Sequence, residues 1–552
     1  MVSKEQSLPL QRVYHWEQVR AHDVYLTQPM EGGAVRDYTW SQAVGEARRM
    51  AAYLKAKGWE PGTRVGILSK NCAWWIMSDL AIWMAGYVSV PLYPTLTAES
   101  VRQVLEHSEA KACFIGKLDE WPQMKSGVPD SVHCISYPAS PKNDYATWDD
   151  IVKKTAPIDG NPTRAADELA TIIYTSGTTG MPKGVMHSFK TFLVAASTVA
   201  DSFSITPNER MLSHLPLSHV AERWAIEAGS FYCGFRIFFA ESLDTFARDL
   251  RSAKPTVFAT VPRLWTKFQQ GVFAKMPKKR LDFLFSLPVL GGVFKKKILK
   301  AVGFEHTRFA MGGAAPMPPS LINWYRSLGL ELLEAYGMTE NFGMSHGSMP
   351  GEGRVGYVGK PWPGVECKLS EIGEVLVRSP SNMLGYFREP EKTREVLSED
   401  GWLKTGDLGA FDEAGRLRIT GRAKEIFKTS KGKYVAPAPI ESKLSALSAI
   451  EALCVAGANY GQPCALVMLA PDAAKQDRAA LTTQLKAQLE SVNATLDPHE
   501  QLDFLVVVKD NWTVENGFIT PTLKIKRNVV ETAYGPFLDA WYKQRQPVIW
   551  QE

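Results

Sequence analysis

The stretch from Glu168 to Val185, "ELATIIYTSGTTGMPKGV", decides the fold prediction for this chain. Its first half is apolar with several β-branched residues, which predicts a buried strand. From Thr175 onward it holds three glycines, four hydroxyl side chains and Lys183. Glycines let backbone N–H groups converge on one centre and hydroxyls add donors, so the loop is predicted to cradle an oxyanion. The lysine charge makes a polyphosphate the expected ligand.

Two better-known phosphate patterns do not fit this loop. The pattern G-x-x-x-x-G-K-[ST] requires a glycine five residues after Gly177, where Pro182 stands. The Rossmann pattern G-x-G-x-x-G is missing as well. A flexible surface loop is the alternative interpretation, but the position directly after a buried strand favours the phosphate site.

Strand-like and helical patterns alternate through the first four hundred residues. An amphipathic helix is predicted to open at Ser41, and further strands are predicted at "TRVGIL" (63–68), "AKACFIG" (110–116) and "PTVFATVP" (255–262). Strands separated by helices imply parallel sheets covered on both faces. The fold class is therefore α/β, with a large multi-layer N-terminal domain of βαβ-type sheets over residues 1–421.

The sequence changes character near residue 420. The segment "GRLRITGRAKEIFKTSKGKYVAPAPIE" (415–441) is rich in glycine and lysine. Beyond it, strand and helix patterns alternate over roughly a hundred residues, a normal size for a small domain. Residues 422–552 are predicted to form an α+β C-terminal domain, with the junction near Lys424.

Composition narrows the class of protein. Of 552 residues 45% are hydrophobic, and 63 basic against 58 acidic residues give a net charge of +5. No basic arm accompanies this charge, so nucleic acid is not an expected partner. The seven cysteines are scattered without a C-x-x-C pair, which fits a reducing cytoplasm and gives no zinc pattern. The chain is expected to be soluble, as a monomer or homodimer.

One apolar stretch could be mistaken for a membrane span, "WWIMSDLAIWMAGYVSVPLYP" from Trp74. Asp79 lies in its middle, and Gly86 and Pro91 interrupt its end. A span needs about 20 uninterrupted apolar residues, so a buried helix followed by a core strand is the better prediction.

Five motifs in order carry a family resemblance. They are "YTSGTTGMPKGV" (174–185), "EAYGMTE" (334–340), "GWLKTGD" (401–407), "GRAKE" (421–425) and "TPTLKIKR" (520–527). With them the chain resembles the acyl-adenylate-forming superfamily, most of all its long-chain fatty acyl-CoA synthetases. The resemblance implies a ligase that converts a medium- or long-chain fatty acid and ATP to acyl-AMP and pyrophosphate, then transfers the acyl group to CoA. It also implies Mg²⁺ and a mobile C-terminal domain.

The resemblance assigns roles to individual residues. Those expected to bind ATP or AMP are Thr175, Ser176, Gly177, Thr178, Thr179, Gly180, Lys183, Gly313, Ala314, Tyr336, Gly337, Asp407 and Arg422. Those expected to take part in catalysis are Lys524, Thr339, Glu340 and His219, with Glu340 also the Mg²⁺ ligand. Lys424 is expected to be the hinge of the small domain. Trp224 is expected to lie at the acyl pocket.

Within these roles, Tyr336 would stack on adenine and Asp407 would accept hydrogen bonds from the ribose hydroxyls. Lys524 would bridge the carboxylate and the α-phosphate as a point charge. The family motif usually reads P-x-G-K, and Leu523 replaces its glycine. This departure looks like the fatty-acid-activating branches. Gly312 and Gly313 would let the backbone approach the ligand.

Other functions share these motifs or part of them. A fatty-acyl-AMP ligase would deliver its product to a carrier protein, and related CoA ligases accept aromatic or other acids. A luciferase-like oxygenase carries the same loops. "GMSHG" (343–347) matches the hydrolase pattern G-x-S-x-G around Ser345, but the helix that the pattern needs next is not predicted there. A non-catalytic nucleotide-binding protein would have no need of Lys524 and Glu340.

The segment 277–304, "PKKRLDFLFSLPVLGGVFKKKILKAVGF", sets apolar residues between basic clusters. That composition suits peripheral contact with a membrane surface. The alternative is two short core helices joined by "PVLGG" with solvated ends. Pro288, Gly291 and Gly292 would break a single helix, which favours this alternative.

Overall fold

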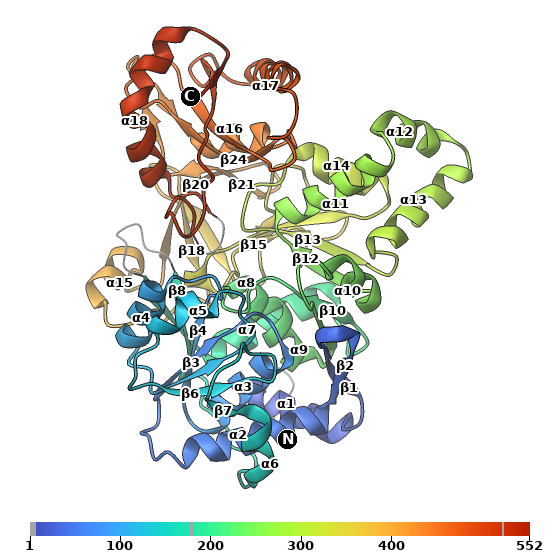
Figure 1. The fold of residues 1–552 in the computed structure, drawn as a ribbon, viewed down its shortest axis with the longest axis vertical. Helices are drawn as coiled ribbons and strands as arrows, with labels where there is room; N and C mark the ends of the chain where they lie inside the picture. The colour runs from blue at the N-terminus through green and yellow to red at the C-terminus, as the bar shows by residue number, and fades with distance from the viewer. Residues whose placement is uncertain (1–6, 176–181, 521–523) are drawn as a thin grey trace.

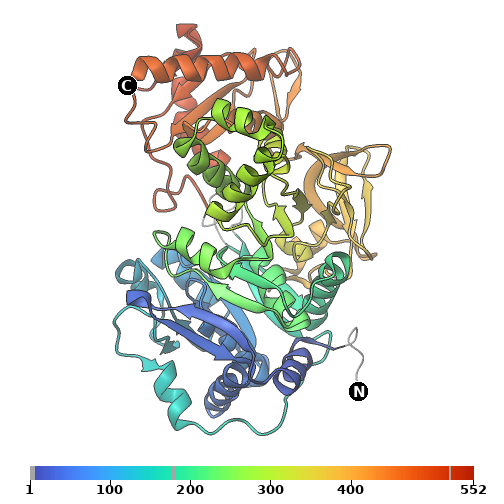
Figure 2. The same ribbon diagram turned by 90° about the vertical axis from the view of Figure 1, so that its right-hand side faces the viewer.

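The computed structural model describes residues 7–175, 182–520 and 524–552. It confirms the α/β class, with several mixed sheets in the N-terminal part and a smaller α+β part at the C-terminal end (Figure 1). The turned view in Figure 2 shows the C-terminal part at one end of the elongated molecule.

The largest sheet has eight strands, and one of them is the buried strand predicted from "ELATIIYT". Its spatial order is β19 (Gly385–Tyr386), β9 (Lys183–Ser188), β8 (Leu169–Thr175), β4 (Val88–Leu92), β3 (Arg64–Leu68), β5 (Ala112–Ile115), β6 (His133–Ser136) and β7 (Ala146–Thr147). Strands β8 to β7 run parallel to one another, and β9 and β19 add an antiparallel edge. The strands predicted at 63–68 and 110–116 are thus confirmed.

Helices cover both faces of this sheet, as a parallel sheet requires. Those on one face are α1 (Pro9–Val19), α2 (Trp40–Lys55), α3 (Ala73–Met84), α6 (Trp148–Lys154) and α7 (Phe189–Phe203), and those on the other are α4 (Ala98–His107) and α5 (Trp121–Met124). Every residue of α3 is buried, which confirms the buried helix predicted from Trp74. The predicted start of α2 at Ser41 was wrong by two residues, because the Thr39 side chain caps the helix and Gln42 completes a capping box.

Two further sheets complete the main body. One has the order β10 (Arg210–Ser213), β11 (Arg236–Phe239), β1 (Val24–Pro29) and β2 (Val35–Thr39). The other has the order β12 (Val257–Thr260), β13 (Phe309–Gly312), β14 (Leu332–Tyr336), β15 (His346–Gly347) and β16 (Lys360–Pro361). Strand β12 confirms the strand predicted within 255–262.

Helices between these strands include α8 (Val220–Glu222), a π-helix (Arg223–Ala228), α9 (Gly229–Cys233), α10 (Phe246–Ala253), α11 (Pro262–Lys275), α12 (Lys278–Ser286), α13 (Leu290–Val302) and α14 (Pro319–Ser327). Helices α12 and α13 project from the body as a pair (Figure 1). No helix in the described part of the chain is long and apolar enough to cross a membrane.

An antiparallel sheet leads to the C-terminal part. Its strands are β17 (Glu366–Leu369), β18 (Glu374–Arg378), β20 (Leu403–Phe411) and β21 (Leu417–Arg422), with α15 (Pro390–Val396) between β18 and β20. Beyond β21 come the hairpin β22 (Phe427–Lys428) and β23 (Tyr434–Val435), and a sheet of β24 (Ile450–Ala456), β25 (Cys464–Leu469), β26 (Leu505–Val507) and β27 (Val548–Trp550). Helices α16 (Pro437–Leu444), α17 (Arg478–Asn493) and α18 (Arg527–Gln544) pack on that sheet, whose two faces have separate cores.

Candidate functional site

The predicted phosphate loop connects two neighbouring antiparallel strands. Thr175, the last residue of β8, pairs with Lys183, the first residue of β9. Ser176, Gly177, Thr178, Thr179 and Gly180 lie outside the described residues. The Lys183 ammonium lies 4.8 Å from the ring centre of Tyr386, a cation–π distance. The hairpin therefore fixes both ends of the loop at the edge of the largest sheet.

The "YGMTE" motif ends in a short 3₁₀ turn, Thr339–Asn341, which the protein holds from two sides. His187 Nε2 donates a hydrogen bond to the Thr339 carbonyl oxygen at 2.8 Å. Burial lowers the pKa of His187 to about 3, so the ring stays neutral. On the other side, the Tyr386 hydroxyl donates to Glu340 Oε1 at 2.8 Å. The turn therefore presents Glu340 in one orientation.

Glu340 fits the role of a Mg²⁺ ligand. Mg²⁺ in nucleotide enzymes keeps several waters and takes one or two protein carboxylates besides the substrate phosphates. Among the described residues no cluster of three or more metal-binding side chains occurs. Tyr386 holds Oε1, and within the described part of the chain no hydrogen bond engages Oε2. One carboxylate oriented in this way suits a cation that the nucleotide brings with it.

Asp407, Tyr336 and Arg422 form a second polar group across neighbouring sheets. The Tyr336 hydroxyl donates to Asp407 Oδ2 at 2.6 Å, and Arg422 Nε donates to Oδ1 at 2.9 Å. Burial and the Asp407 charge raise the pKa of Tyr336 well above its ordinary value, so the phenol keeps its proton. Each carboxylate oxygen has a second lone pair that a ribose hydroxyl could use. The structure thus brings three predicted nucleotide residues together.

Gly312 and Gly313, the glycines predicted to let the backbone approach the ligand, pack closely against other protein atoms. A Cβ on Gly312 would lie 2.4 Å from Met317 Sδ, and one on Gly313 would lie 2.9 Å from the Ala335 carbonyl oxygen. These contacts require glycine at both positions, and the expectation that the two residues let the backbone approach the ligand stays a prediction. Ala314 follows with φ of +66°, a strained value for a residue with a side chain.

Gly337 also leaves no room for a side chain. A Cβ there would lie 2.2 Å from the Gly343 carbonyl oxygen, so the backbone on either side of the Thr339 turn touches. Any larger residue would push the turn and its carboxylate away from the sheet.

Lys524 lies in the C-terminal part of the chain and interacts electrostatically with Asp407 and Arg422. Its side chain keeps access to solvent, but the surrounding protein excludes much of the bulk water. This desolvation lowers the pKa of Lys524, and the neighbouring Arg422 lowers it further. The carboxylates of Asp407, Glu340 and Glu425 act in the opposite sense and raise the pKa of Lys524. The lysine therefore lies within electrostatic reach of both polar groups.

His219 caps helix α8 and lies within electrostatic reach of Lys524. The backbone N–H of Ala221 donates to His219 Nδ1 at 3.1 Å. Desolvation, with a smaller effect of Lys524, lowers the pKa of His219 to about 4. At neutral pH the ring is therefore uncharged and carries its proton on Nε2. His219 can donate a hydrogen bond into the site but is poorly suited to accept a proton.

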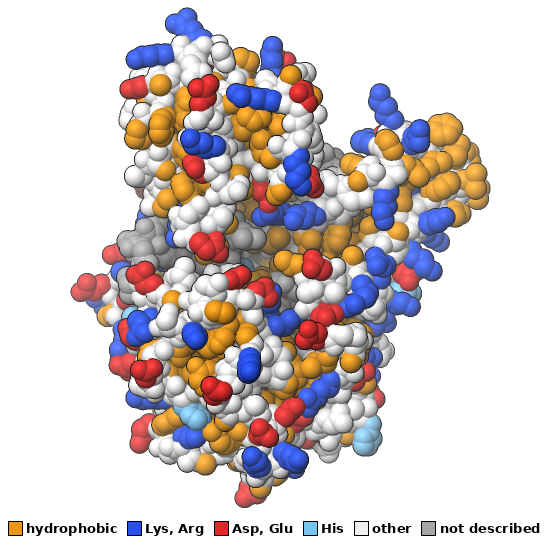
Figure 3. All heavy atoms as spheres, viewed as in Figure 1, with side chains coloured by type: hydrophobic (Ala, Val, Ile, Leu, Met, Phe, Trp, Pro, Cys, Tyr) orange, Lys and Arg blue, Asp and Glu red, His pale blue; other side chains and the backbone are white. Residues whose placement is uncertain are grey.

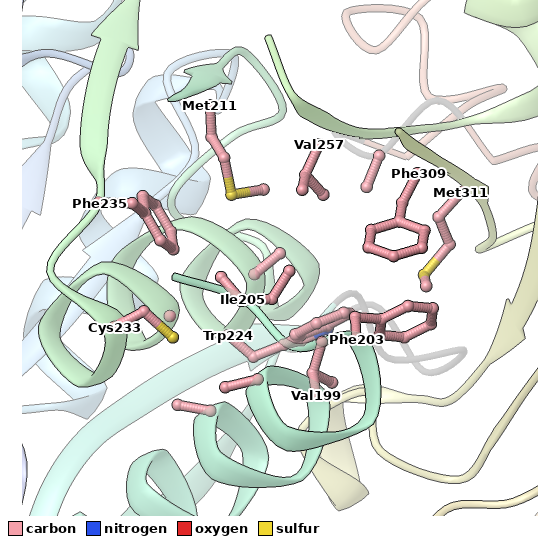
Figure 4. A pocket seen from close by; sticks show the side chains of 15 residues that line it. Val199, Phe203, Ile205, Met211, Trp224, Cys233, Phe235, Val257, Phe309 and Met311 are labelled. Atoms are coloured by element: carbon pink, nitrogen blue, oxygen red, sulfur yellow. The ribbon is translucent and has the colours of Figure 1, made fainter. Parts of the chain in front are cut away.

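An apolar pocket adjoins these polar groups (Figure 4). About 540 Å³ within it is free of protein atoms, a volume that includes space open to solvent. Its lining includes Trp224, which is 8% exposed, and side chains from α7, α9, β12 and β13. Figure 4 shows Met311 and Phe309 at one end and Phe235 and Cys233 at the other. The complete lining is Ala196, Val199, Ala200, Phe203, Ile205, Met211, Trp224, Ala225, Gly229, Cys233, Phe235, Val257, Ala259, Phe309 and Met311.

The pocket reaches the nucleotide motif through Trp224. A Cβ on Gly343 would lie 2.7 Å from the Trp224 indole nitrogen, so the indole packs against the backbone just after the Thr339 turn. At the same end, Met311 directly precedes Gly312 and Gly313. The apolar space therefore ends beside the polar groups.

A buried ionic cluster supports this wall of the pocket. Arg223, the first residue of the π-helix, donates from Nη1 to Asp79 Oδ2 at 2.9 Å and lies 3.4 Å from Glu227 Oε2. All three side chains are fully buried. Burial raises the pKa of Glu227 well above its ordinary value, so we treat it as protonated beside the Arg223–Asp79 pair. π-Helices of this kind are often found at functional sites.

Sequence reasoning missed Tyr386, His187 and this cluster. Asp79 gave the one available signal, because an acid within an apolar helix is rarely buried without a partner.

The hydrolase alternative finds no support at Ser345. The Ser345 hydroxyl and His346 Nδ1 are 2.8 Å apart, but both residues are fully buried. Strand β15 follows directly, where a nucleophile elbow requires a helix.

A glycine-packed turn that carries a carboxylate lies beside an apolar pocket, and a lysine lies within electrostatic reach of that carboxylate. Such a site suits proteins that bring an apolar acid to a nucleotide. The chain belongs to the AMP-binding enzyme family. The family model for AMP-binding enzymes matches residues 15–387, and the model for their C-terminal domain matches residues 424–546.

Named relatives align over nearly the whole chain. A long-chain-fatty-acid–CoA ligase of Mycobacterium bovis, FadD15, is 31% identical, with 95% of each chain covered. The peroxisomal long chain acyl-CoA synthetase 6 of Arabidopsis thaliana is 30% identical, covering 93% of this chain and 83% of the relative. Among solved structures, the adenylation domain of a carboxylic acid reductase from Segniliparus rugosus superposes with a TM-score of 0.82 at 21% identity, covering 98% of this chain and 94% of that domain. This last similarity concerns the fold.

Proposed function

We propose that the protein is an AMP-forming acid–thiol ligase that activates a medium- or long-chain fatty acid and transfers it to CoA. The observation that carries the proposal is the apolar pocket, whose Trp224 packs against Gly343 just after the Thr339 turn that carries Glu340. An apolar pocket favours long chains, because each buried CH₂ contributes about 0.8 kcal/mol. The names of the relatives support the same substrate class.

The proposed first step joins the two substrates. A carboxylate oxygen of the fatty acid attacks the α-phosphorus of ATP, the bond to pyrophosphate breaks, and acyl-AMP forms. Lys524 lies between the two anions and stabilises the charge that develops. Glu340, oriented by Tyr386, would hold Mg²⁺, which neutralises phosphate charge when bound. Asp407 would hold the ribose and Tyr336 the adenine, and Thr339 would donate to the α-phosphate.

The proposed second step forms the thioester. The CoA thiolate attacks the acyl carbonyl carbon, the carbon–oxygen bond to AMP breaks, and the thiol proton passes to solvent. His219 would donate a hydrogen bond from Nε2 near the reacting carbonyl, since its lowered pKa keeps it neutral. The loop from Thr175 to Lys183 would hold the outer phosphates of ATP.

We also propose that the chain is divided into two domains that move relative to each other. Residues 1–421 would form the adenylating and acyl-binding domain, and residues 422–552 would move about a hinge near Lys424. Lys424 is exposed directly after β21, where a rotation would disturb few contacts. The protein would work in the cytoplasm as a monomer or homodimer, with peripheral membrane contact through residues 277–304.

The test uses purified protein, Mg²⁺-ATP and acids from acetate to oleate, and follows AMP, pyrophosphate and acyl-CoA with and without CoA. AMP and acyl-CoA that rise together, best with long acids, are the expected result. Pyrophosphate and acyl-AMP that form without any response to CoA would favour the alternative of an acyl-AMP ligase serving a carrier protein. ADP in place of AMP would contradict the proposal.

A further inference from the structure

Helices α12 and α13 form a hairpin inserted between β12 and β13, two strands that line the apolar pocket. The base of the hairpin is anchored, because Phe285, Ile298 and Val302 pack against the core that contains residues of these strands. The two helices pack closely where they meet: a Cβ on Gly291 would lie 2.5 Å from the Phe285 carbonyl oxygen. The prediction of two short helices joined at "PVLGG" is confirmed, but the prediction that they are core helices was wrong, because Leu281 and Gly291 are their only buried residues.

The far end of the hairpin is not a core. Four of the twelve large apolar side chains that are exposed in the described part of the chain lie between residues 283 and 293. They are Phe283 at 65%, Val289 at 88%, Leu290 at 54% and Val293 at 59% exposure. We call these four residues the apolar tip. In Figure 3 it is the orange knob that projects from the right of the molecule.

The turn at the tip is strained in a way that keeps an apolar side chain in solvent. Val289 has φ of +61° and ψ of −54°, and the Leu290 N–H donates to the Pro288 carbonyl oxygen at 2.6 Å. This γ-turn is rare, and a β-branched residue within it is unfavourable. Strain of this kind persists mostly at positions with a function.

Basic residues flank the tip. Those in the segment 277–304 are Lys278, Lys279, Arg280, Lys295, Lys296, Lys297 and Lys300, against the single acid Asp282. The segment therefore carries a charge of +6, while the whole chain carries +5, so the rest of the protein has a charge of −1. Asp282 is itself paired with Lys278 at 2.6 Å.

We propose that this hairpin docks the protein on an anionic lipid bilayer, with the apolar tip inserted among the headgroups and the flanking lysines on lipid phosphates. An inserted apolar surface with basic residues around it fits the layered chemistry of a bilayer interface. A projecting tip offers no groove to a peptide. The inference rests on the proposed function in one respect: fatty acids partition into the same bilayer, and the strands flanking the hairpin line the pocket that would receive them.

The test measures co-sedimentation of the full chain with phosphatidylcholine vesicles, with and without phosphatidylglycerol, in the absence of ATP and CoA. The double variant Lys296→Gln/Lys297→Gln should bind the anionic vesicles roughly thirtyfold more weakly, since each lysine near such a surface contributes about 1 kcal/mol. The double variant Val289→Asn/Leu290→Gln should weaken binding by roughly tenfold or more through lost apolar contact. Asparagine tolerates positive φ, so this turn should still form.

Matched controls lie elsewhere on the surface. Lys475→Gln/Lys486→Gln removes two exposed lysines of the C-terminal part, and Ile372→Asn removes an apolar side chain that is 72% exposed. Both controls should bind vesicles like the unaltered protein. Equal binding of all variants, or binding that ignores the anionic lipid, would overturn the proposal.

Two further measurements distinguish membrane docking from dimerisation and from the proposed ligase activity. Sedimentation velocity in the absence of lipid would overturn the proposal if the tip variants dissolve a dimer, because the surface would then belong to a second copy. Ligase activity with decanoate, which is water-soluble, tests the proposed function separately. An active enzyme that ignores vesicles refutes the docking alone, and vesicle binding without ligase activity refutes the proposed function alone.

Discussion

The walls of the apolar pocket come from helices and strands within residues 196–311, whereas the polar site beside it draws side chains from segments between Lys183 and Lys524. The pocket is shaped by packing within one continuous part of the chain. The polar site exists only when the loops and the C-terminal part come together. Selectivity and chemistry should therefore respond to different substitutions.

Lys524→Ala should have the largest effect and should fall on one half-reaction. Acyl-AMP formation should drop by about a hundredfold or more, the usual effect of losing one group that stabilises transition-state charge. Thioester formation from supplied acyl-AMP should change far less, because in that step the thiolate attacks a neutral carbonyl carbon and not a charged phosphate. The control is Lys526→Ala, two residues away. Rapid-quench assays of each half-reaction decide the question, and an equal fall in both would contradict the role.

Cys233→Phe should change selectivity without changing the chemistry. Cys233 lies at the end of the pocket opposite Met311, so a phenyl group there shortens the space for the end of the chain. The ratio of kcat/KM for palmitate to that for octanoate should fall by roughly tenfold or more, since each excluded CH₂ forfeits about 0.8 kcal/mol. The same substitution at Cys367, in strand β17, is the control. A ratio that does not move would exclude the pocket as the acyl site.

Tyr386→Phe should have a moderate effect on the metal dependence. It removes the hydroxyl that donates to Glu340 but keeps the ring beside Lys183. The Mg²⁺ concentration for half-maximal adenylation should rise roughly tenfold, consistent with about 1.5 kcal/mol for one hydrogen bond to a charged group. Tyr434→Phe, at an exposed tyrosine, should leave the curve unchanged. A fall in the rate at saturating Mg²⁺ with no shift of the curve would argue against an orienting role.

Glu222→Gln should affect stability rather than turnover. Glu222 is fully buried and accepts hydrogen bonds from Ser213 and the His214 N–H, but burial raises its pKa from 4.5 to about 8. Between these values the folded protein keeps a proton that the unfolded chain loses. The free energy of unfolding should therefore fall as pH rises through this window, by at most about 1.4 kcal/mol per pH unit.

The glutamine variant should lose this slope, because it has no proton to release. Denaturant unfolding at pH 5, 6, 7 and 8 measures the effect, with Glu490→Gln as an exposed control. Parallel slopes for the variant and the unaltered protein would show that Glu222 does not titrate as its environment implies.

Local patterns predicted the large sheet well. Its strands β3, β5 and β8 and the buried helix α3 follow from apolar runs whose lengths match their elements, as does strand β12 of a neighbouring sheet. The polar residues in motifs also lie together, as Tyr336, Asp407 and Arg422 show.

Contacts between residues far apart in the chain could not be predicted from the sequence. The hydroxyl of Tyr386 orients a carboxylate 46 residues away, and His187 reaches a carbonyl 152 residues away. Neither pairing has a local pattern. Of the pocket lining only Trp224 was expected from the sequence, because the other apolar lining residues look like ordinary core until the space between them is seen.

The most direct test of the central claim follows one oxygen atom. A fatty acid labelled with ¹⁸O in both carboxylate positions is converted to acyl-CoA, and the AMP is examined by mass spectrometry. If the carboxylate attacks the α-phosphorus, each AMP molecule must leave with one ¹⁸O atom, and pyrophosphate must carry none. Label in inorganic phosphate, or AMP without label, would contradict the account.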